Sequence, residues 1–353
     1  MTVLLLGRGT GTAAPDAAPE EVVVHILQRS ADGDDVIFRT DLTGESAVPV
    51  YEHPHIEDFR ATASHLAVSV RTEDDEAALI VTGLGGEAPR ELRLPGDGYI
   101  AQLQSADGEE LVGYTFSDAD LGESGGLESR LFTAELTDGA AEAEPTAVTV
   151  EGGDPRVAEW RFVPEIDSTL LLSFDESLML TGSDGDETAL GEAVTIDGIA
   201  RGSTKGVIER EGEMSVIDLS DASEEPLVEA REELGVLAVA MPMPDGATVR
   251  TSALLDSSGL PTKGTTVSIV EEDGATRVLL EAPPSDAVLQ TCVSPGARYL
   301  AVLVAPDAGS NPYDTYQLPL PERLETRVIE IGDGSEVVSL AGSSISWCQV
   351  PPS

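Results

Sequence analysis

Two cysteines are the residues of this sequence whose spacing most directly suggests a chemical bond. Cys292 and Cys348 are the only cysteines of the 353-residue chain, and they lie 56 positions apart. Each is followed by a proline three positions later. A disulfide between them would require an oxidising compartment, which predicts a protein outside the cytoplasm. The alternative is a pair of buried, reduced thiols in a cytoplasmic protein.

Histidines and acids offer candidates for metal binding and acid–base chemistry. His53 and His55 form the only histidine cluster and are weak metal candidates, because a structural zinc site needs four ligands. Adjacent acids such as Glu57 and Asp58 could serve glycoside chemistry, but 65 acids make such neighbours inevitable. The sequence holds no nucleophile elbow, phosphate loop or dinucleotide fingerprint. We therefore assign no catalytic residue, no metal and no cofactor.

A segment rich in proline and tyrosine is the strongest candidate for a partner-binding surface. It runs from 305 to 325 and contains Tyr313, Tyr316, Leu318 and Leu320, in a chain that is only 4% aromatic. Long loops in compact domains are often functional, and tyrosine is a frequent interface anchor. These four residues are the predicted partner-binding candidates. The alternative is a loop that packs on its own domain.

The charge balance excludes several classes of partner. The chain has 65 acids against 20 bases and a formal net charge of −45. Binding to nucleic acid or to an anionic membrane surface depends on clustered Lys and Arg. We therefore expect a protein partner, and neither nucleic acid nor an anionic membrane. Apolar residues make up 41% of the chain, which is enough for a large core and argues against general disorder.

Short apolar runs alternate along the chain with Asp-Gly or Gly-Gly turns. Such dipeptides between alternating runs are a strong signal for tight hairpins. Grouped in this way, most of the chain falls into units of about 50 residues with four strands each, a period typical of propellers and solenoids. One such unit has its strands at 57–63, 65–71, 77–82 and 90–94.

The two ends of the chain complement each other. The stretches 22–27, 35–41 and 48–51 make three strands that lack an innermost partner, while 343–350 is one strand left over. Placing the last strand inside the first three closes a ring and leaves no exposed sheet edge at the junction. We predict an all-β, seven-bladed β-propeller of four-stranded antiparallel blades over 21–353, closed by the C-terminal strand. The cysteine-bearing strands then lie side by side, so that a disulfide would latch the ring.

Three motifs resemble the turns of TolB-like and WD40-like β-propeller blades. Ser294–Val302 is similar to the Ser-Pro-Asp-Gly signature that joins the first two strands of such blades, with Gly296 in place of the Asp. Pro244–Gly246 and Ala106–Val112 stand at the same place in their units. The second, fourth and fifth units lack the motif. The resemblance implies a propeller fold, and a fold does not by itself imply a function.

The first 20 residues differ from the rest in composition. Val3 to Leu6 is apolar but too short to span a membrane, and 10–20 is rich in small residues and proline. We interpret 1–20 as a disordered linker, or as the remnant of a signal or anchor segment that begins upstream. The second reading would give the protein an N-terminal membrane anchor that this chain does not contain.

These observations predict a non-enzymatic propeller, exported or tethered at the cell surface, that serves as a protein- or ligand-binding platform. The alternative is an extracellular glycan hydrolase or lyase that uses carboxylates in the central channel. A deep pocket with converging carboxylates would favour the enzyme. We expect the partner-binding loops on the face where second strands connect to third strands.

Overall fold

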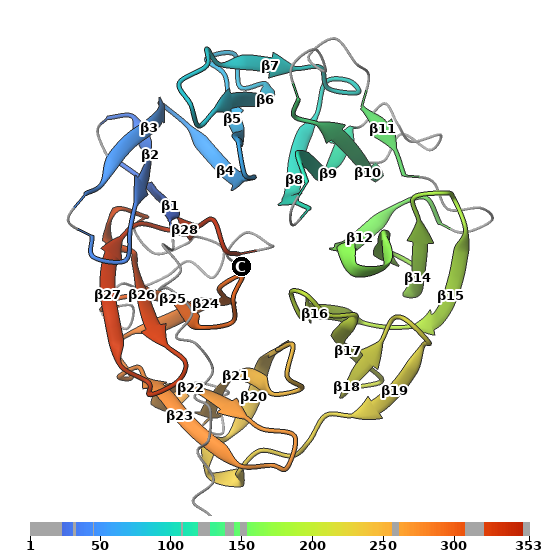
Figure 1. Ribbon diagram of the computed structural model, residues 1–353, viewed down its shortest axis with the longest axis vertical. Coiled ribbons are helices and arrows are strands. Elements are labelled where there is room, and N and C mark those ends of the chain that lie inside the picture. The colour runs from blue at the N-terminus through green and yellow to red at the C-terminus, as the bar shows by residue number, and fades with distance from the viewer. Residues whose placement is uncertain are drawn as a thin grey trace, which may run out of the picture.

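Seven four-stranded antiparallel sheets stand around a common axis like the blades of a propeller (Figure 1). The computed structural model describes residues 23–30, 33–44, 46–106, 109–118, 128–137, 145–148, 154–255, 261–307 and 321–348. The predicted fold class is confirmed. Helical structure in the described residues is confined to 3-10 turns, among them Pro164–Ile166, Glu232–Leu234 and Pro321–Arg323.

The strands of each blade follow one another from the axis outward, and the first blade alone takes its innermost strand from the far end of the chain. Blade 1 consists of β28 (Ser344–Ile345), β1 (Val24–Gln28), β2 (Asp35–Thr40) and β3 (Val48–His53). Blade 2 consists of β4 (Ile56–Ala61), β5 (His65–Arg71), β6 (Ala77–Gly83) and β7 (Arg90–Leu92). Blade 3 consists of β8 (Tyr99–Ser105), β9 (Leu111–Asp118), β10 (Glu128–Glu135) and β11 (Thr146–Ala147).

The remaining four blades follow in chain order. Blade 4 consists of β12 (Val157–Val163), β13 (Ser168–Ser173), β14 (Ser177–Gly182) and β15 (Glu187–Glu192). Blade 5 consists of β16 (Thr195–Ile199), β17 (Lys205–Arg210), β18 (Glu213–Asp218) and β19 (Ser223–Pro226). Blade 6 consists of β20 (Val236–Pro242), β21 (Thr248–Leu255), β22 (Pro261–Val270) and β23 (Thr276–Glu281). Blade 7 consists of β24 (Ala287–Val293), β25 (Tyr299–Ala305), β26 (Glu325–Glu330) and β27 (Glu336–Ala341).

The core of the protein lies between neighbouring blades. One cluster joins Leu79 and Val81 of blade 2 to Val112 and Tyr114 of blade 3, all essentially inaccessible to solvent. The same arrangement recurs between blades 6 and 7. Because each blade buries its faces against the next one, the apolar burial that drives folding depends on a ring without a gap.

The innermost strands of blades 2 to 7 share an irregularity. In each of them the pairing with the second strand shifts by a β-bulge, as between Val157 and Glu159 or between Ile196 and Gly198. A bulge bends a strand, increases its twist and redirects a side chain. The bulges therefore let polar side chains on these strands reach the neighbouring blade.

The ring closes where the two ends of the chain meet. Strand β28 pairs antiparallel with β1, with Ile345 opposite Ile26 and Ser344 opposite Leu27. This confirms the predicted closure, although the strand is much shorter than the predicted 343–350. The chain turns after Ile345, where the amide of Cys348 donates a hydrogen bond of 3.1 Å to the Ile345 oxygen.

The turn after β28 brings Cys348 to Cys292 on β24. A disulfide joins the two residues, whose Cα atoms are 5.1 Å apart. The bond thus links the final described turn of the chain to blade 7. No helix among the described residues is long and apolar enough to cross a membrane. Residues 1–20, interpreted above as a linker or anchor remnant, lie outside the described residues.

Candidate functional site

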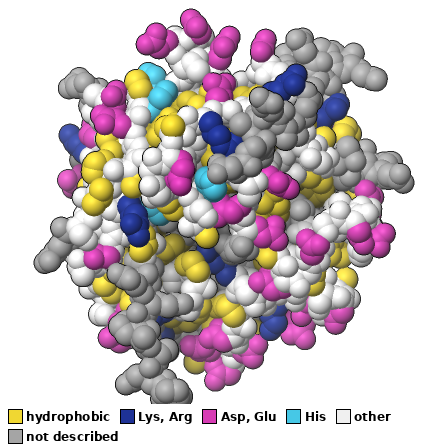
Figure 2. Space-filling view, turned by 45° about the horizontal axis from the view of Figure 1, so that its top comes forward, with side chains coloured by type: hydrophobic (Ala, Val, Ile, Leu, Met, Phe, Trp, Pro, Cys, Tyr) yellow, Lys and Arg dark blue, Asp and Glu magenta, His cyan; other side chains and the backbone are white. Residues whose placement is uncertain are grey.

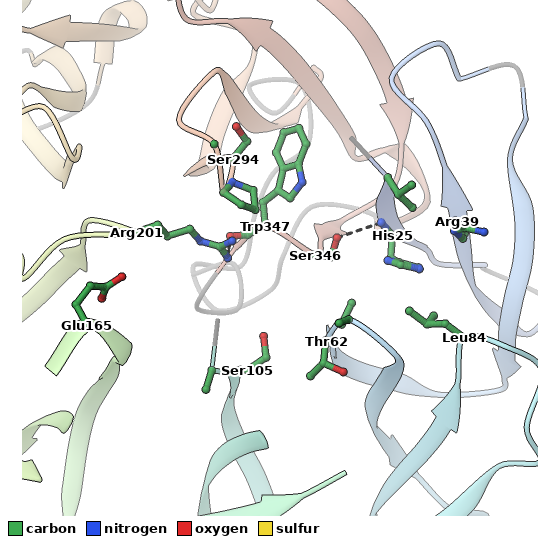
Figure 3. Close-up of a pocket in the computed structure, with 17 residues that line it drawn as sticks. His25, Arg39, Thr62, Leu84, Ser105, Glu165, Arg201, Ser294, Ser346 and Trp347 are labelled. Atoms are coloured by element: carbon green, nitrogen blue, oxygen red, sulfur yellow. Dashed lines mark hydrogen bonds between the residues drawn. The ribbon is translucent and has the colours of Figure 1, made fainter. Parts of the chain in front are cut away.

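A cavity of about 880 Å³ lies at one mouth of the ring (Figure 3). Its wall is made mainly by the connections between the first and second strands of several blades. They contribute Ala63 of blade 2, Ser105 of blade 3, Glu165 of blade 4, Gly202 of blade 5 and Pro295 of blade 7. The volume is in the range that is usual for ligand sites. We call this space the mouth cavity.

The closure of the ring forms part of the wall of the mouth cavity. His25 and Ser346 both line it and hold each other. The His25 amide donates a hydrogen bond of 3.1 Å to Ser346 Oγ, and the Ser346 amide donates one of 2.9 Å to the His25 oxygen. Substituting His25 or Ser346 would therefore alter both the cavity wall and the junction that completes blade 1.

Trp347 is fixed in the wall by three contacts. Its ring stacks on Tyr299 with the centroids 6.4 Å apart, and the next residue carries the disulfide. Arg201 of blade 5 donates a hydrogen bond of 2.8 Å from Nη2 to the Trp347 oxygen. In Figure 3, Arg201 reaches towards Trp347 from the side of the cavity opposite His25 and Arg39. The C-terminal turn is thus held from two sides of the ring.

His25 and Arg39 form a cross-strand pair at the same mouth. They are directly opposite each other on β1 and β2, and both line the cavity. His25 is only 5% exposed, and burial together with the nearby Arg39 charge lowers its pKa to about 4. The imidazole is therefore neutral at physiological pH, and Arg39 carries the positive charge on this side.

Three acids join neighbouring blades instead of facing the mouth cavity. Each accepts a hydrogen bond from a backbone amide at the innermost strand of the following blade. The pairs are Asp35 Oδ2 with the Ile56 amide at 3.1 Å, Glu159 Oε2 with the Ile196 amide at 3.0 Å, and Asp197 Oδ2 with the Ala240 amide at 2.8 Å. Amide nitrogens of Gln102 and Gln104 similarly donate to carbonyls of blade 4. We call these contacts the inter-blade clasps.

The clasps bear on the possibility of paired catalytic carboxylates. Burial raises the pKa of Asp197, and the neighbouring Glu159 charge raises it further. Such a pair is what acid–base chemistry on glycans would use. Neither residue lines the mouth cavity, however, and Glu165 is the one acid among the described residues that does. The described geometry thus does not gather two carboxylates around the cavity.

The acids singled out in the sequence form ion pairs. Glu57 Oε1 lies 2.7 Å from Arg71 Nε, and Asp58 Oδ1 lies 2.7 Å from Arg60 Nη1 inside blade 2. Burial nevertheless raises the pKa of Asp58, against the opposing effect of Arg60. These arrangements are explained by packing and surface pairing, without any substrate.

The structure describes the predicted histidine pair but not the predicted tyrosine segment. The His55 amide donates a hydrogen bond of 3.2 Å to His53 Nδ1, and both residues lie at the surface. No group of three or more His, Cys, Asp or Glu that could hold a metal occurs in the described part of the chain. Tyr313, Tyr316, Leu318 and Leu320 lie outside the described residues, so the predicted partner-binding segment stays a prediction.

The mouth cavity is on the face that sequence reasoning did not choose. The cavity is lined mainly by connections between first and second strands, whereas we expected the partner-binding loops where second strands connect to third strands. His25, Arg39 and Arg201 were not predicted as site residues. A usable signal was present, because Arg201 lies near the end of the predicted innermost strand 196–202 and Trp347 adjoins a predicted disulfide. Arg39, however, could be placed only once the pairing of β1 and β2 was known.

Acidic side chains gather toward the edge of the face seen in Figure 2, where basic side chains are few. The chain carries 65 acids and 20 bases. Among the described residues, the charged or ionisable side chains that line the mouth cavity are Arg39, Arg201, the neutral His25 and Glu165. The described part of its lining thus departs from the acidic character of the chain.

The fold and this cavity define the class of protein as a seven-bladed β-propeller with a ligand-sized cavity at one mouth. No protein-family model and no curated protein matches the chain. Among solved structures, it is similar to the β-propeller domain of the Trilobed protease from Pyrococcus furiosus. The identity is 10% over 90% of this chain and 94% of that chain, with a TM-score of 0.58.

Two further structures are similar. A structure from a study of two prolyl endopeptidases matches at 11% identity over 94% of this chain and 50% of that chain, with a TM-score of 0.60. A putative TolB from Agrobacterium tumefaciens matches at 13% identity over 91% of this chain and 89% of that chain, with a TM-score of 0.41. The chain thus spans half of the endopeptidase chain. The resemblance to propellers is confirmed for the fold, and identities this low carry no activity across.

Proposed function

We propose that this propeller is a non-enzymatic binding platform that receives a protein partner at its mouth cavity. The observation that carries this proposal is the construction of the cavity wall. Turns from several blades, the ring closure and the disulfide-held Trp347 converge on one space of about 880 Å³. Rigid scaffolds that position turns around a cavity are the usual form of a binding site.

The alternative of a glycan hydrolase or lyase has less support. Its best observation is the Glu159–Asp197 pair, in which burial raises the pKa of Asp197. Both carboxylates already accept backbone hydrogen bonds from the next blade and do not line the cavity. The hydrogen bonds between blades explain Glu159 and Asp197 without catalysis, so we retain the platform as the proposed function.

The location of the protein outside the cytoplasm is a separate proposal, and its support is the disulfide. A bond between Cys292 and Cys348 persists in an oxidising compartment and is rarely kept in the cytosol. We expect mass spectrometry of non-reduced peptides from natively expressed protein to find the two cysteines linked. Two free thiols in that material would contradict the proposed location and would support a cytoplasmic protein.

Site-specific photo-cross-linking tests the platform. A benzoylphenylalanine is introduced at Ala63, which is exposed at the mouth cavity, and matched against one at Val337 on β27. A third variant carries the probe at Tyr313, in the segment predicted from the sequence. Irradiation in a native extract should give a discrete protein adduct from position 63 and none from position 337.

The three positions separate the possible results. An adduct from position 313 alone would move the site to the segment 305–325 and reject the mouth cavity. Equal labelling from all three positions would indicate non-specific contact and would also reject it. Adducts from both 63 and 313 but not from 337 would support a partner that engages the mouth cavity together with the segment 305–325.

A further inference from the structure

The acids and the bases of this protein make different kinds of contact. We propose that the closed ring depends on a salt-rich medium, because cations of the solvent must screen exposed acids that the chain's own bases do not pair. The inference does not rest on the proposed function, since it concerns the medium in which the fold is stable and not the partner. Its support lies in what the arginines bind, where the acids stand and how neighbouring blades meet.

Several arginines bind main-chain oxygens of the next blade. The pairs are Arg29 Nη2 with the Glu57 oxygen at 2.9 Å, Arg90 Nη2 with the Thr137 oxygen at 3.0 Å, Arg161 Nη2 with the Ile196 oxygen at 2.7 Å, and Arg277 Nη1 with the Ile331 oxygen at 2.6 Å. Arg90 and Arg277 form no ion pair within the described ranges. A carbonyl oxygen accepts such a bond without being an ion, so these contacts join the blades and leave the acids without a paired base.

The turn between β5 and β6 shows how the exposed acids stand. It carries the consecutive acids Glu73, Asp74, Asp75 and Glu76, and all of them are exposed. Only Asp75 pairs with a base of the described chain, Arg71, whose Nη1 lies 3.3 Å from Asp75 Oδ1. Exposed pairs of this kind contribute little and weaken as salt is added. Neighbouring like charges repel one another, and the whole chain has 65 acids against 20 bases.

Turns between third and fourth strands bring acids to the junctions between blades. A Cβ at Gly44, in blade 1, would lie 3.3 Å from Val338 Cγ2 in blade 7. A Cβ at Gly274, in blade 6, would lie 3.7 Å from Val228 Cγ1, just after the last strand of blade 5. The acids of these two turns are Asp41, Glu271, Glu272 and Asp273. Because each turn rests on the neighbouring blade, the charge of one blade acts on the next, and repulsion opposes closure of the ring.

Salt weakens this repulsion more than it weakens the contacts that hold the blades together. The screening length falls from about 30 Å at about 0.01 M salt to about 3 Å at about 1 M. Apolar burial between blades is not screened, and partly buried contacts are screened much less than exposed charges. A net charge far from zero destabilises a compact state. With a net charge of −45, the ring should therefore gain stability as salt is added.

Thermal unfolding of the full chain across a salt series tests the proposal. The midpoint should rise by about 10 °C or more between about 0.05 M and about 2 M NaCl. KCl should act alike, because screening depends on ionic strength. Sucrose at matched osmolality is the control, since it favours compact states without screening charge. A midpoint that does not rise with NaCl, or that rises equally in sucrose, overturns the proposal.

Two matched variants of the turn between β5 and β6 separate charge from side-chain shape. Glu73→Gln/Asp74→Asn/Glu76→Gln removes the charge, whereas Glu73→Asp/Asp74→Glu/Glu76→Asp keeps it at the same positions. The neutral variant should melt about 2 °C or more above the wild type at low salt, and this difference should vanish at about 2 M NaCl. The charge-keeping variant should follow the wild type throughout. Equal salt dependence of the two variants overturns the proposal.

Two arginine variants test the role given to the bases. Arg277→Gln removes the contact with the Ile331 oxygen, so its midpoint should fall at low and at high salt. Arg231→Gln removes the same charge at an exposed residue, whose Nη1 lies 4.0 Å from Glu233 Oε1, and should lower the midpoint at low salt only. A loss confined to low salt in both variants would show that Arg277 acts as a counter-charge, and would reject the division between bases that bind backbone and acids that need salt.

Discussion

Arg201 Nη2 donates a hydrogen bond of 2.8 Å to the main-chain oxygen of Trp347, although 146 positions separate the two residues in the sequence. The contact ties blade 5 to the turn that follows the last strand. On its other side, the same turn is tied to blade 7 by the disulfide. His25, Ser346 and Trp347 thus belong both to the closure of the ring and to the lining of the mouth cavity, which links stability to binding.

Removing the disulfide should destabilise the whole ring. The double variant Cys292→Ser/Cys348→Ser opens a loop of 56 positions, for which the loop-entropy relation gives about 4 kcal/mol of unfolding free energy. Chemical denaturation of the oxidised wild type and the variant measures this difference. Adding a reductant should lower the stability of the wild type only. Equal stability of the wild type and the variant without reductant would show that the disulfide does not hold the ring.

Gly342 should tolerate no side chain. It joins β27 to β28 with φ of +147°, and a Cβ there would lie 2.6 Å from both Ile26 Cγ1 and the Leu27 oxygen. We expect Gly342→Ala to cost about 2 kcal/mol or more of unfolding free energy, because backbone must move at the closure. Gly332→Ala is the matched control, since a Cβ there meets no atom within 4 Å. Similar denaturation midpoints for the two variants would be incompatible with the described closure.

His25 should make the protein less stable in acid. In the folded protein its pKa is about 4, below the ordinary value of 6.5 that the unfolded chain retains, so the unfolded chain takes up the proton first as pH falls. Stability that is fully present above pH 6.5 is therefore lost towards pH 4, by between about 2 and 3 kcal/mol at pH 4.5. His25→Gln should remove this part of the difference in unfolding free energy between about pH 7.5 and pH 4.5. The surface variant His53→Gln should not, and identical pH profiles for His25→Gln and wild type would refute the assignment.

The inter-blade clasps should contribute to the stability of the ring. Asp197→Ala leaves the buried Ala240 amide without its acceptor, which should cost about 1–3 kcal/mol of unfolding free energy. Asp197→Asn keeps an acceptor and removes a carboxyl whose pKa burial raises, so its loss should be smaller. Glu225→Ala, at an exposed acid on β19, should change stability by less than about 0.5 kcal/mol. Denaturant titration of the three variants checks this order, and equal losses for Ala and Asn would contradict the clasp.

The repeat was predictable from the sequence because turns and strands leave local signals. Asp-Gly turns and the spacing of apolar runs identified the blades, and the leftover segment at 343–350 identified the closure. Strand ends were less predictable, as the short β28 illustrates: it ends at a turn that carries Cys348, which is bonded to Cys292, 56 positions away. Hydrogen bonds between distant segments leave no local pattern.

The mouth cavity was less accessible to sequence reasoning for the same reason. His25, Arg39 and Arg201 come from blades 1 and 5, and nothing in their local sequence marks them as neighbours. Their arrangement depends on the register of β1 against β2 and on the position of Trp347. Loop length and aromatic content drew attention to 305–325 instead, which contributes no described residue to the mouth cavity.

Amide hydrogen exchange of the protein alone and with its cross-linked partner is the decisive measurement for a binding platform at the mouth cavity. We expect slower exchange on complex formation in the turns at 61–65, 200–204 and 294–298 and in 343–348, which surround the mouth cavity. The outer strand β27 should exchange as before. Protection confined to the connections between second and third strands, with the mouth turns unchanged, would contradict the proposed site.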